Sequence, residues 1–194
     1  MTNYGLKVNS KYDVSEYEER VMTTAGDVVL FESGVYKIYC DGDTFVKHNI
    51  TSNLMHIICI SVRDEIKINI EAVGIISDGV SDVQHKIISK NKNVEMNIKV
   101  KSIADNDAKI IYRSSIGGVE NSTGMGNQNA KFIMLSNECE IDAEPSLNLA
   151  SNLIPTTHNV AISGVSKENI FYMSLHGLNN KESETELVHS FLNS

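Results

Sequence analysis

Tryptophan is absent from this chain of 194 residues, proline occurs only twice, and aromatic residues make up 6%. Positive charge is also scarce, with 17 Lys and Arg against 25 Asp and Glu, so a basic surface for nucleic acid or an anionic membrane is not expected. The N-terminal residues lack the apolar stretch of a secretory signal, and the longest apolar run, around residues 57–60, is far too short to span a bilayer. These absences predict a cytoplasmic protein that binds neither nucleic acid nor a membrane.

Cysteine is also sparse, at three residues: Cys40, Cys59 and Cys139. An odd number without a C-x-x-C motif argues against a disulfide framework, and in the cytoplasm these thiols are expected to be reduced. Their spacing is unlike that of ferredoxins, so one chain is not expected to enclose an iron–sulfur cluster by itself. Cys59 lies within an apolar run and is expected in the core, Cys40 ends a strand, and Cys139 is expected at a turn where its thiol can be reached.

Short β-rich runs separated by polar turns dominate the middle of the chain. The isoleucines of 66–70 alternate with polar residues, and so do the apolar residues of 94–100, which predicts strands with one buried and one solvated face. The run 54–62 is almost continuously apolar, as in a strand buried on both faces. The glycines around 117–118 and 124–126 predict a flexible loop. A sandwich, a barrel and a β-helix all fit this pattern, and its period does not choose among them.

Helices are expected only near the C-terminus. Ser166 can cap a first helix that Gly177 ends, and Asn180 can cap a second. The second helix carries an apolar stripe formed by Leu187, Val188, Phe191 and Leu192, which must dock on its own domain, a second copy or a partner. The chain is therefore divided into a polar lead-in (1–24), a β core (25–165) and a C-terminal helical segment (166–194).

Several short elements between residues 108 and 192 follow one another in a family-like order. They are Tyr112-Arg113 on a strand, a polar turn over 141–145 that ends in Pro145, Thr157-His158 before a strand, Phe171-Tyr172 in a helix, and Gly177 after it. This order resembles the SufB/SufD family, the β-helical scaffold proteins of iron–sulfur cluster assembly. The chain departs from the family at Asn159, where glycine or an acid is usual, and at His176, where arginine is usual. No thiol stands near Lys131 or Phe132, where the family's cluster-building cysteine is expected.

The resemblance implies a mainly β fold, a right-handed β-helix core with two short C-terminal α-helices. It implies that the helices dock a SufC-type ATPase, here through Phe171, Tyr172, Leu187, Val188 and Phe191. It also implies that the β-helix edges pair into a homodimer or a SufB/SufD-type heterodimer, where an iron–sulfur cluster or iron is held transiently. The protein would then be a scaffold and not an enzyme, with no catalytic residue of its own, because ATP hydrolysis belongs to the partner.

The donors available for such a metal site are Cys139, His158 and Glu140. His56 alternates within a buried run and is expected to be a core residue, while His48 and His85 belong to no recognisable cluster. The acids Glu138, Glu140, Asp142 and Glu144 suit a solvated surface better than acid–base catalysis. Two other functions remain open from the sequence, a metal-free structural β-helix protein and a carbohydrate-active one, although the scarcity of aromatic residues disfavours the second.

Overall fold

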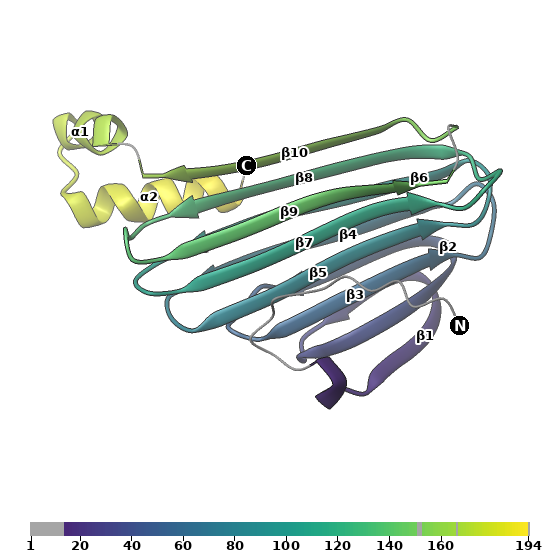
Figure 1. Cartoon of the computed structure of the whole chain (residues 1–194). Helices are drawn as coiled ribbons and strands as arrows, with labels where there is room; N and C mark the ends of the chain where they lie inside the picture. The colour runs from purple at the N-terminus through teal and green to yellow at the C-terminus, as the bar shows by residue number, and fades with distance from the viewer. Residues whose placement is uncertain (1–13, 151–152, 166, 194) are drawn as a thin grey trace.

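The computed structural model describes residues 14–150, 153–165 and 167–193. It is a parallel β-solenoid of about four turns followed by two helices (Figure 1), which confirms the expected β-helix and excludes the sandwich and the barrel. The elements are η1 (Val14–Glu16), β1 (Glu19–Leu30), β2 (Gly34–Asn49), β3 (Leu54–Ser61), β4 (Lys67–Ile76), β5 (Val80–Ser89), β6 (Val94–Ala104), β7 (Lys109–Gly118), β8 (Gly124–Met134), β9 (Glu140–Leu149), β10 (Thr156–Gly164), α1 (Lys167–Leu175) and α2 (Asn180–Asn193).

Two faces of parallel strands enclose the core. Strands β3, β5, β7 and β9 stack into one face, which we call face A, and β4, β6, β8 and β10 into the other, face B. The long strand β2 joins them, because residues 34–40 pair with β3 while residues 44–49 pair with β4. Strand β1 pairs along β2 and closes the N-terminal end.

The turns of the solenoid are unequal in length. On face B, Lys67 pairs with Glu95 and Glu95 pairs with Met125, so the later turn takes up more of the chain than the earlier one. On face A, Val80 pairs with Lys109 and Lys109 pairs with Glu140, and again the later turn is the longer. Since only the alternation of inward and outward side chains is shared between turns, the sequence contains no visible repeat of fixed period.

Apolar side chains at alternate positions fill the space between the faces. The predicted alternation is confirmed in β4, where Ile68 and Ile70 are fully buried while Lys67 is exposed, and in β6, where Val94, Met96, Ile98 and Val100 are all buried. Burying each such side chain contributes roughly 1.5–3 kcal/mol before the entropy cost of ordering it. Strand β3, predicted to be covered on both sides, has seven of its eight residues buried.

Two segments that were expected to be turns or loops are strands. Residues 141–145 belong to β9, where Pro145 is tolerated because β9 is an edge strand. The glycine pairs 117–118 and 124–126 lie at the end of β7 and the start of β8. Their glycines allow close packing: a Cβ atom on Gly118 would lie 2.3 Å from Cδ1 of Ile154, and one on Gly117 would lie 2.8 Å from the carbonyl oxygen of Asn148.

The two helices form a hairpin at the end of β10. Gly177, at φ 89°, follows the end of α1 as predicted, whereas the predicted cap Ser166 lies outside the described residues. The cap of α2 is Asn179, one residue earlier than expected. The Asn179 side chain accepts a hydrogen bond from the backbone N–H of Glu182 at 3.0 Å, and the Glu182 carboxylate accepts one from the backbone N–H of Asn179 at 2.8 Å.

Helix α2 lies against the outer surface of face B. Its predicted apolar stripe, Leu187, Val188, Phe191 and Leu192, is half-buried, and the ammonium group of Lys101 on β6 lies 5.9 Å from the Phe191 ring centroid. The protein itself therefore covers part of the stripe. Neither described helix is both long enough and apolar enough to cross a membrane.

Candidate metal and interface site at the open end

The C-terminal end of the solenoid is open. In the part of the chain that the structure describes, β9 pairs only with β7 and β10 only with β8, so the outer edge of each strand has no backbone partner (Figure 1). Side chains that would face a further turn are only half covered, among them Leu147 (37% exposed), Val160 and Ile162 (45% exposed). An apolar end with two unpaired edges is a natural surface for pairing with another β-structure.

His158 lies at this open end, in the third position of β10. It is in register with Gln128 of β8, whose side chain is buried, and its own side chain is exposed. Gln128 is held from two sides: its Oε1 accepts a hydrogen bond from Oγ of Ser114 at 2.6 Å, and its Nε2 donates one to the carbonyl oxygen of Ser146 at 2.9 Å. The neighbour of His158 on β8 is therefore a polar side chain whose position two hydrogen bonds fix.

Cys139 lies in the turn before β9 and, contrary to expectation, is buried, with 5% of its surface exposed. Its thiol donates to the carbonyl oxygen of Ser136 at 3.1 Å and lies 3.6 Å from that of Ala104. A partner or a substrate could reach this sulfur only after movement of the turn.

Cys139 and His158 lie at opposite ends of the strands. Ala104, which contacts Cys139, is in register with Met134, and Met134 with Gly164, which lies at the far end of β10 from His158. At about 3.3 Å per residue the two side chains are separated by about 20 Å. Among the described residues no three His, Cys, Asp or Glu side chains are close enough together to hold a metal ion. Thiolate and imidazole suit iron chemically, but one chain does not bring these donors together.

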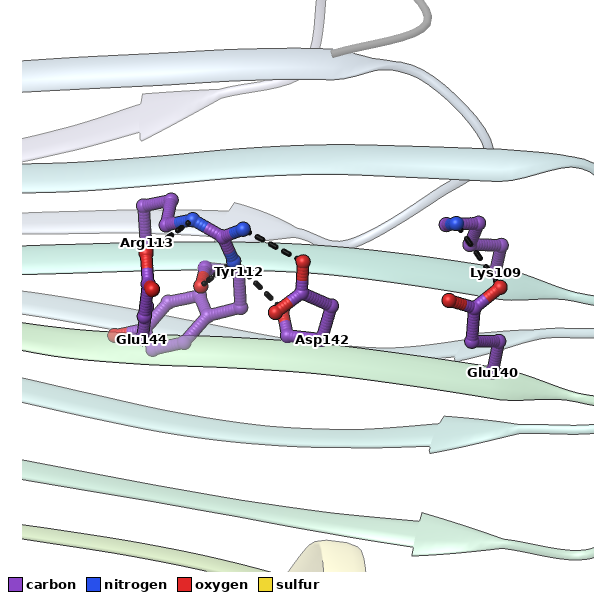
Figure 2. A network of polar contacts seen from close by, with 6 residues as sticks. All are labelled: Lys109, Tyr112, Arg113, Glu140, Asp142 and Glu144. Atoms are coloured by element: carbon purple, nitrogen blue, oxygen red, sulfur yellow. Dashed lines mark hydrogen bonds and ion pairs between the residues drawn. The ribbon is translucent and has the colours of Figure 1, made fainter. Parts of the chain in front are cut away.

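Glu140, the third predicted donor, lies on the outer surface of β9 with Asp142 and Glu144. Figure 2 shows that these acids face the cations of β7: Glu140 contacts Lys109 at 2.9 Å, and Arg113 contacts Asp142 at 2.6 Å and Glu144 at 3.1 Å. The Arg113 side chain is 14% exposed and also donates to the carbonyl oxygen of Asp142 at 3.0 Å. The acids thus fasten the edge strand β9 to β7, as expected for a charged surface.

Cys40 and Cys59 lie in the core, both fully buried and on adjacent strands. A hydrogen bond with Cys40, together with burial, raises the pKa of the Cys59 thiol. A protonated, enclosed thiol such as that of Cys59 behaves as a small apolar side chain.

Sequence reasoning missed a pair of histidines inside the solenoid. His48 of β2 and His85 of β5 join their Nε2 atoms across the core at 2.7 Å, and both are buried. A signal for them exists: each takes the place of an apolar residue in an alternating strand, His48 two positions after the buried Val46 and His85 between the buried Val83 and Ile87. His56, by contrast, is a core residue as expected, with its Nε2 2.9 Å from a carboxylate oxygen of Asp82.

The predicted docking residues separate into two groups. Phe171 and Tyr172 of α1 are both 64% exposed, and Leu175 beside them is 68% exposed. Leu187, Val188 and Phe191 of α2 are half-buried instead, and the first and last line a groove between α2 and the ends of β8 and β10. The free apolar surface of the hairpin is therefore on α1.

Known proteins are similar to this chain over most of the solenoid and the helical hairpin. Residues 45–191 match the family described as SUF system FeS cluster assembly, SufBD core domain. A protein of Staphylococcus epidermidis named "Iron-sulfur cluster assembly SufBD family protein" is 28% identical over 136 residues, which cover 69% of this chain and 29% of that protein. A relative of the same family name from Staphylococcus aureus strain USA300 is 30% identical over 114 residues, 58% of this chain and 24% of its own length.

The match includes β3 to β10, all of α1, most of α2 and the open end, although the chain spans less than a third of these relatives. The agreement covers the solenoid and the hairpin in one continuous segment. The chain belongs to the SufBD family of iron–sulfur cluster assembly proteins.

Proposed function

We propose that this chain is a SufB/SufD-like scaffold or partner subunit of an iron–sulfur cluster assembly complex in the cytoplasm, working with a SufC-type ATPase and catalysing no reaction of its own. The family match over residues 45–191 supports the assembly role. The single structural observation that carries the proposal is the open end, where two unpaired strand edges and His158 lie together. Three unpaired cysteines suit a reducing compartment.

The partner at the open end is a second copy of this chain. A two-fold axis perpendicular to both faces would place β9 antiparallel to the partner's β9 and β10 antiparallel to the partner's β10. Each copy would then satisfy the free edges of the other, and the half-exposed Leu147, Val160 and Ile162 would be covered. A SufB/SufD-type heterodimer would use the same edges.

Such a dimer would also join the separated donors. Because the two-fold axis reverses strand direction, the Cys139 end of one copy would lie beside the His158 end of the other. Two equivalent sites would form, each with a thiol, an imidazole and the nearby carboxylate of Glu140. Sulfur and nitrogen donors favour iron, which is the cargo of the complex. Cys139 would have to emerge from its turn, and motion driven by the ATPase is the proposed cause.

The ATPase would bind the helical hairpin. Phe171 and Tyr172 are exposed and free to contact a partner, whereas Leu187, Val188 and Phe191 hold α2 against the solenoid and fix the position of α1. Exposed aromatic side chains on a positioned helix are typical anchors of protein interfaces.

Anaerobic co-expression with a SufC-type ATPase, followed by affinity capture and size exclusion, tests this proposal. We expect the wild-type chain to co-elute with the ATPase, and the double substitution Phe171→Ser, Tyr172→Ser to weaken binding roughly 100-fold or more, as loss of two aromatic anchors implies. Val29→Ser with Phe31→Ser is the matched control, since these side chains are 52% and 82% exposed at the opposite end of the solenoid. Failure of the wild-type chain to co-elute, or full binding by the α1 variant, would contradict the proposal.

A metal-free structural subunit is the second candidate. The burial of Cys139 and its separation from His158 favour this candidate, because a buried thiol far from the imidazole is poorly placed to bind a cluster. The two candidates predict the same dimer and the same ATPase contact but differ in bound iron.

A further inference from the structure

The His48–His85 contact is the only direct link between two imidazoles among the described residues. It joins β2 to β5 through the core, with the two rings at 73° and their centroids 5.0 Å apart. His85 also packs edge-on against Tyr112, whose ring centroid lies 5.6 Å away. The pair is thus part of the packed interior and not a surface feature.

The hydrogen bonds fix the protonation state of the pair. Nδ1 of His48 lies 3.2 Å from the carbonyl oxygen of Asn49 and must donate to it, so Nε2 of neutral His48 is an acceptor. Nε2 of His85 then donates to Nε2 of His48 at 2.7 Å, and Nδ1 of His85 is left as a buried acceptor without a partner in the described structure. The contact between the two rings is therefore a single hydrogen bond, made by the proton on Nε2 of His85.

Protonation of either imidazole at low pH destabilises the native arrangement of the pair. A first added proton goes either to Nδ1 of His85 directly or to Nε2 of His48 with a change of tautomer in His85. Both routes place an N–H on Nδ1 of His85, which has no acceptor among the described residues, and both bury a positive charge. A second added proton makes two N–H groups face each other at 2.7 Å. Burial lowers the pKa of His48 to about 4 and, together with the charge of His48, lowers the pKa of His85 well below its ordinary value.

Among the described residues, no carboxylate is in register with the pair to compensate that charge. The residues in register with the pair are uncharged: Leu30, Ala72, Ile57 and Ser114. Asp82 lies three residues away along β5, about 10 Å, and is already bonded to His56. The other titratable or charged groups nearby are Tyr112 in the core, Lys47 and Glu71 on the outer surface near His48, and Arg113 and Glu144 near His85. His56 also lies near enough for its charge to lower the pKa of His85.

We propose that the His48–His85 pair is an acid-sensitive latch that fastens the N-terminal strands β1 and β2 to the body of the solenoid. Within residues 14–150, strand β1 pairs only with β2, and His48 is near the end of β2. Opening the latch therefore loosens these two strands before the strands that follow. The His48–His85 bond is the feature that distinguishes them from β6–β8, where no such pair occurs among the described residues.

Hydrogen–deuterium exchange with mass spectrometry, corrected for the pH dependence of the intrinsic rate, tests the latch at about pH 7.5 and pH 5. Unfolded histidine, with a pKa of 6.5, takes up a proton between these values while native His48, with a pKa of about 4, does not. Native protection is therefore complete above 6.5 and falls as the pH drops toward 4. Each histidine that takes up its proton only after opening contributes roughly 30-fold, so we expect protection in residues 19–49 to fall, relative to β6–β8, by that factor for His48 and by a similar factor for His85. An equal change in both regions would overturn the proposal.

Variants separate the latch from general acid sensitivity. The double substitution His48→Leu, His85→Phe removes both polar partners and is expected to abolish the extra loss in residues 19–49. His189→Gln, an exposed histidine of α2, is the control and should retain it. His48→Gln, which keeps an acceptor for His85, is the second variant if the double variant does not fold. It should roughly halve the loss on a logarithmic scale, and an unchanged loss would overturn the proposal.

Discussion

Replacement of Gly124 by alanine is expected to destabilise the fold severely. Gly124 begins β8 with φ at 150°, and a Cβ atom there would lie 1.9 Å from the carbonyl oxygen of Val94 on the neighbouring strand β6. Backbone is the obstacle, so no side-chain rotation relieves the clash. Strain and overpacking together cost about 4 kcal/mol or more, against a typical total stability of about 5–15 kcal/mol.

Far-UV circular dichroism and urea unfolding measure this effect. Gly164→Ala is the matched control on the same face, because the nearest atom to its added Cβ would be 4.0 Å away, and its stability is expected to change by about 0.5 kcal/mol or less. A Gly124→Ala protein that unfolds at the wild-type urea concentration would show that residues 124–126 form an adaptable loop and not a strand.

Substitution of Ile162 by aspartate is expected to dissociate the proposed dimer. Ile162 is in register with the buried Phe132 and therefore points into the core side of β10, yet it is 45% exposed because no further turn covers it. A charge buried there without a partner costs about 3 kcal/mol or more at an interface, which is a loss of roughly 100-fold in affinity.

Sedimentation velocity over a concentration series measures that loss. Ala161→Asp is the control, since Ala161 is exposed and in register with Lys131, on the outer side of the same strand. The monomer should remain folded in both variants, because each position is already partly open to solvent. If the Ile162→Asp variant dimerised with unchanged affinity, the open end would not be the dimer interface.

The strands of this fold could be predicted wherever alternation was regular. In residues 68–72 of β4 and 94–100 of β6 the inward positions carry only apolar residues, so a period of two is visible. The choice of a solenoid could not be made in that way, because stacked turns of unequal length share a direction of side chains and no fixed spacing. That choice came from the resemblance to a family.

The errors have physical causes. Strand β9 contains Pro145 and a row of acids, which are typical of a turn. At the edge of the solenoid the missing backbone N–H of proline is tolerated, and the acids pair with cations of β7. The burial of Cys139 depends on how the turn before β9 folds over the end of β6, which no local pattern shows. The His48–His85 pair joins two strands that are far apart in the chain and becomes visible only when the two faces are assembled.

We propose that Cys139 of one copy and His158 of the other share each metal site, and iron content in defined heterodimers tests this arrangement most directly. Differently tagged Cys139→Ser and His158→Ala chains are co-expressed anaerobically, and the mixed dimer is isolated. If the site spans two copies, this dimer retains one complete site and half of the wild-type iron. A dimer of the wild-type chain with a chain carrying both substitutions then binds none. The reverse pattern, or iron unaffected by either substitution, would show that the two copies do not share a metal site through these residues.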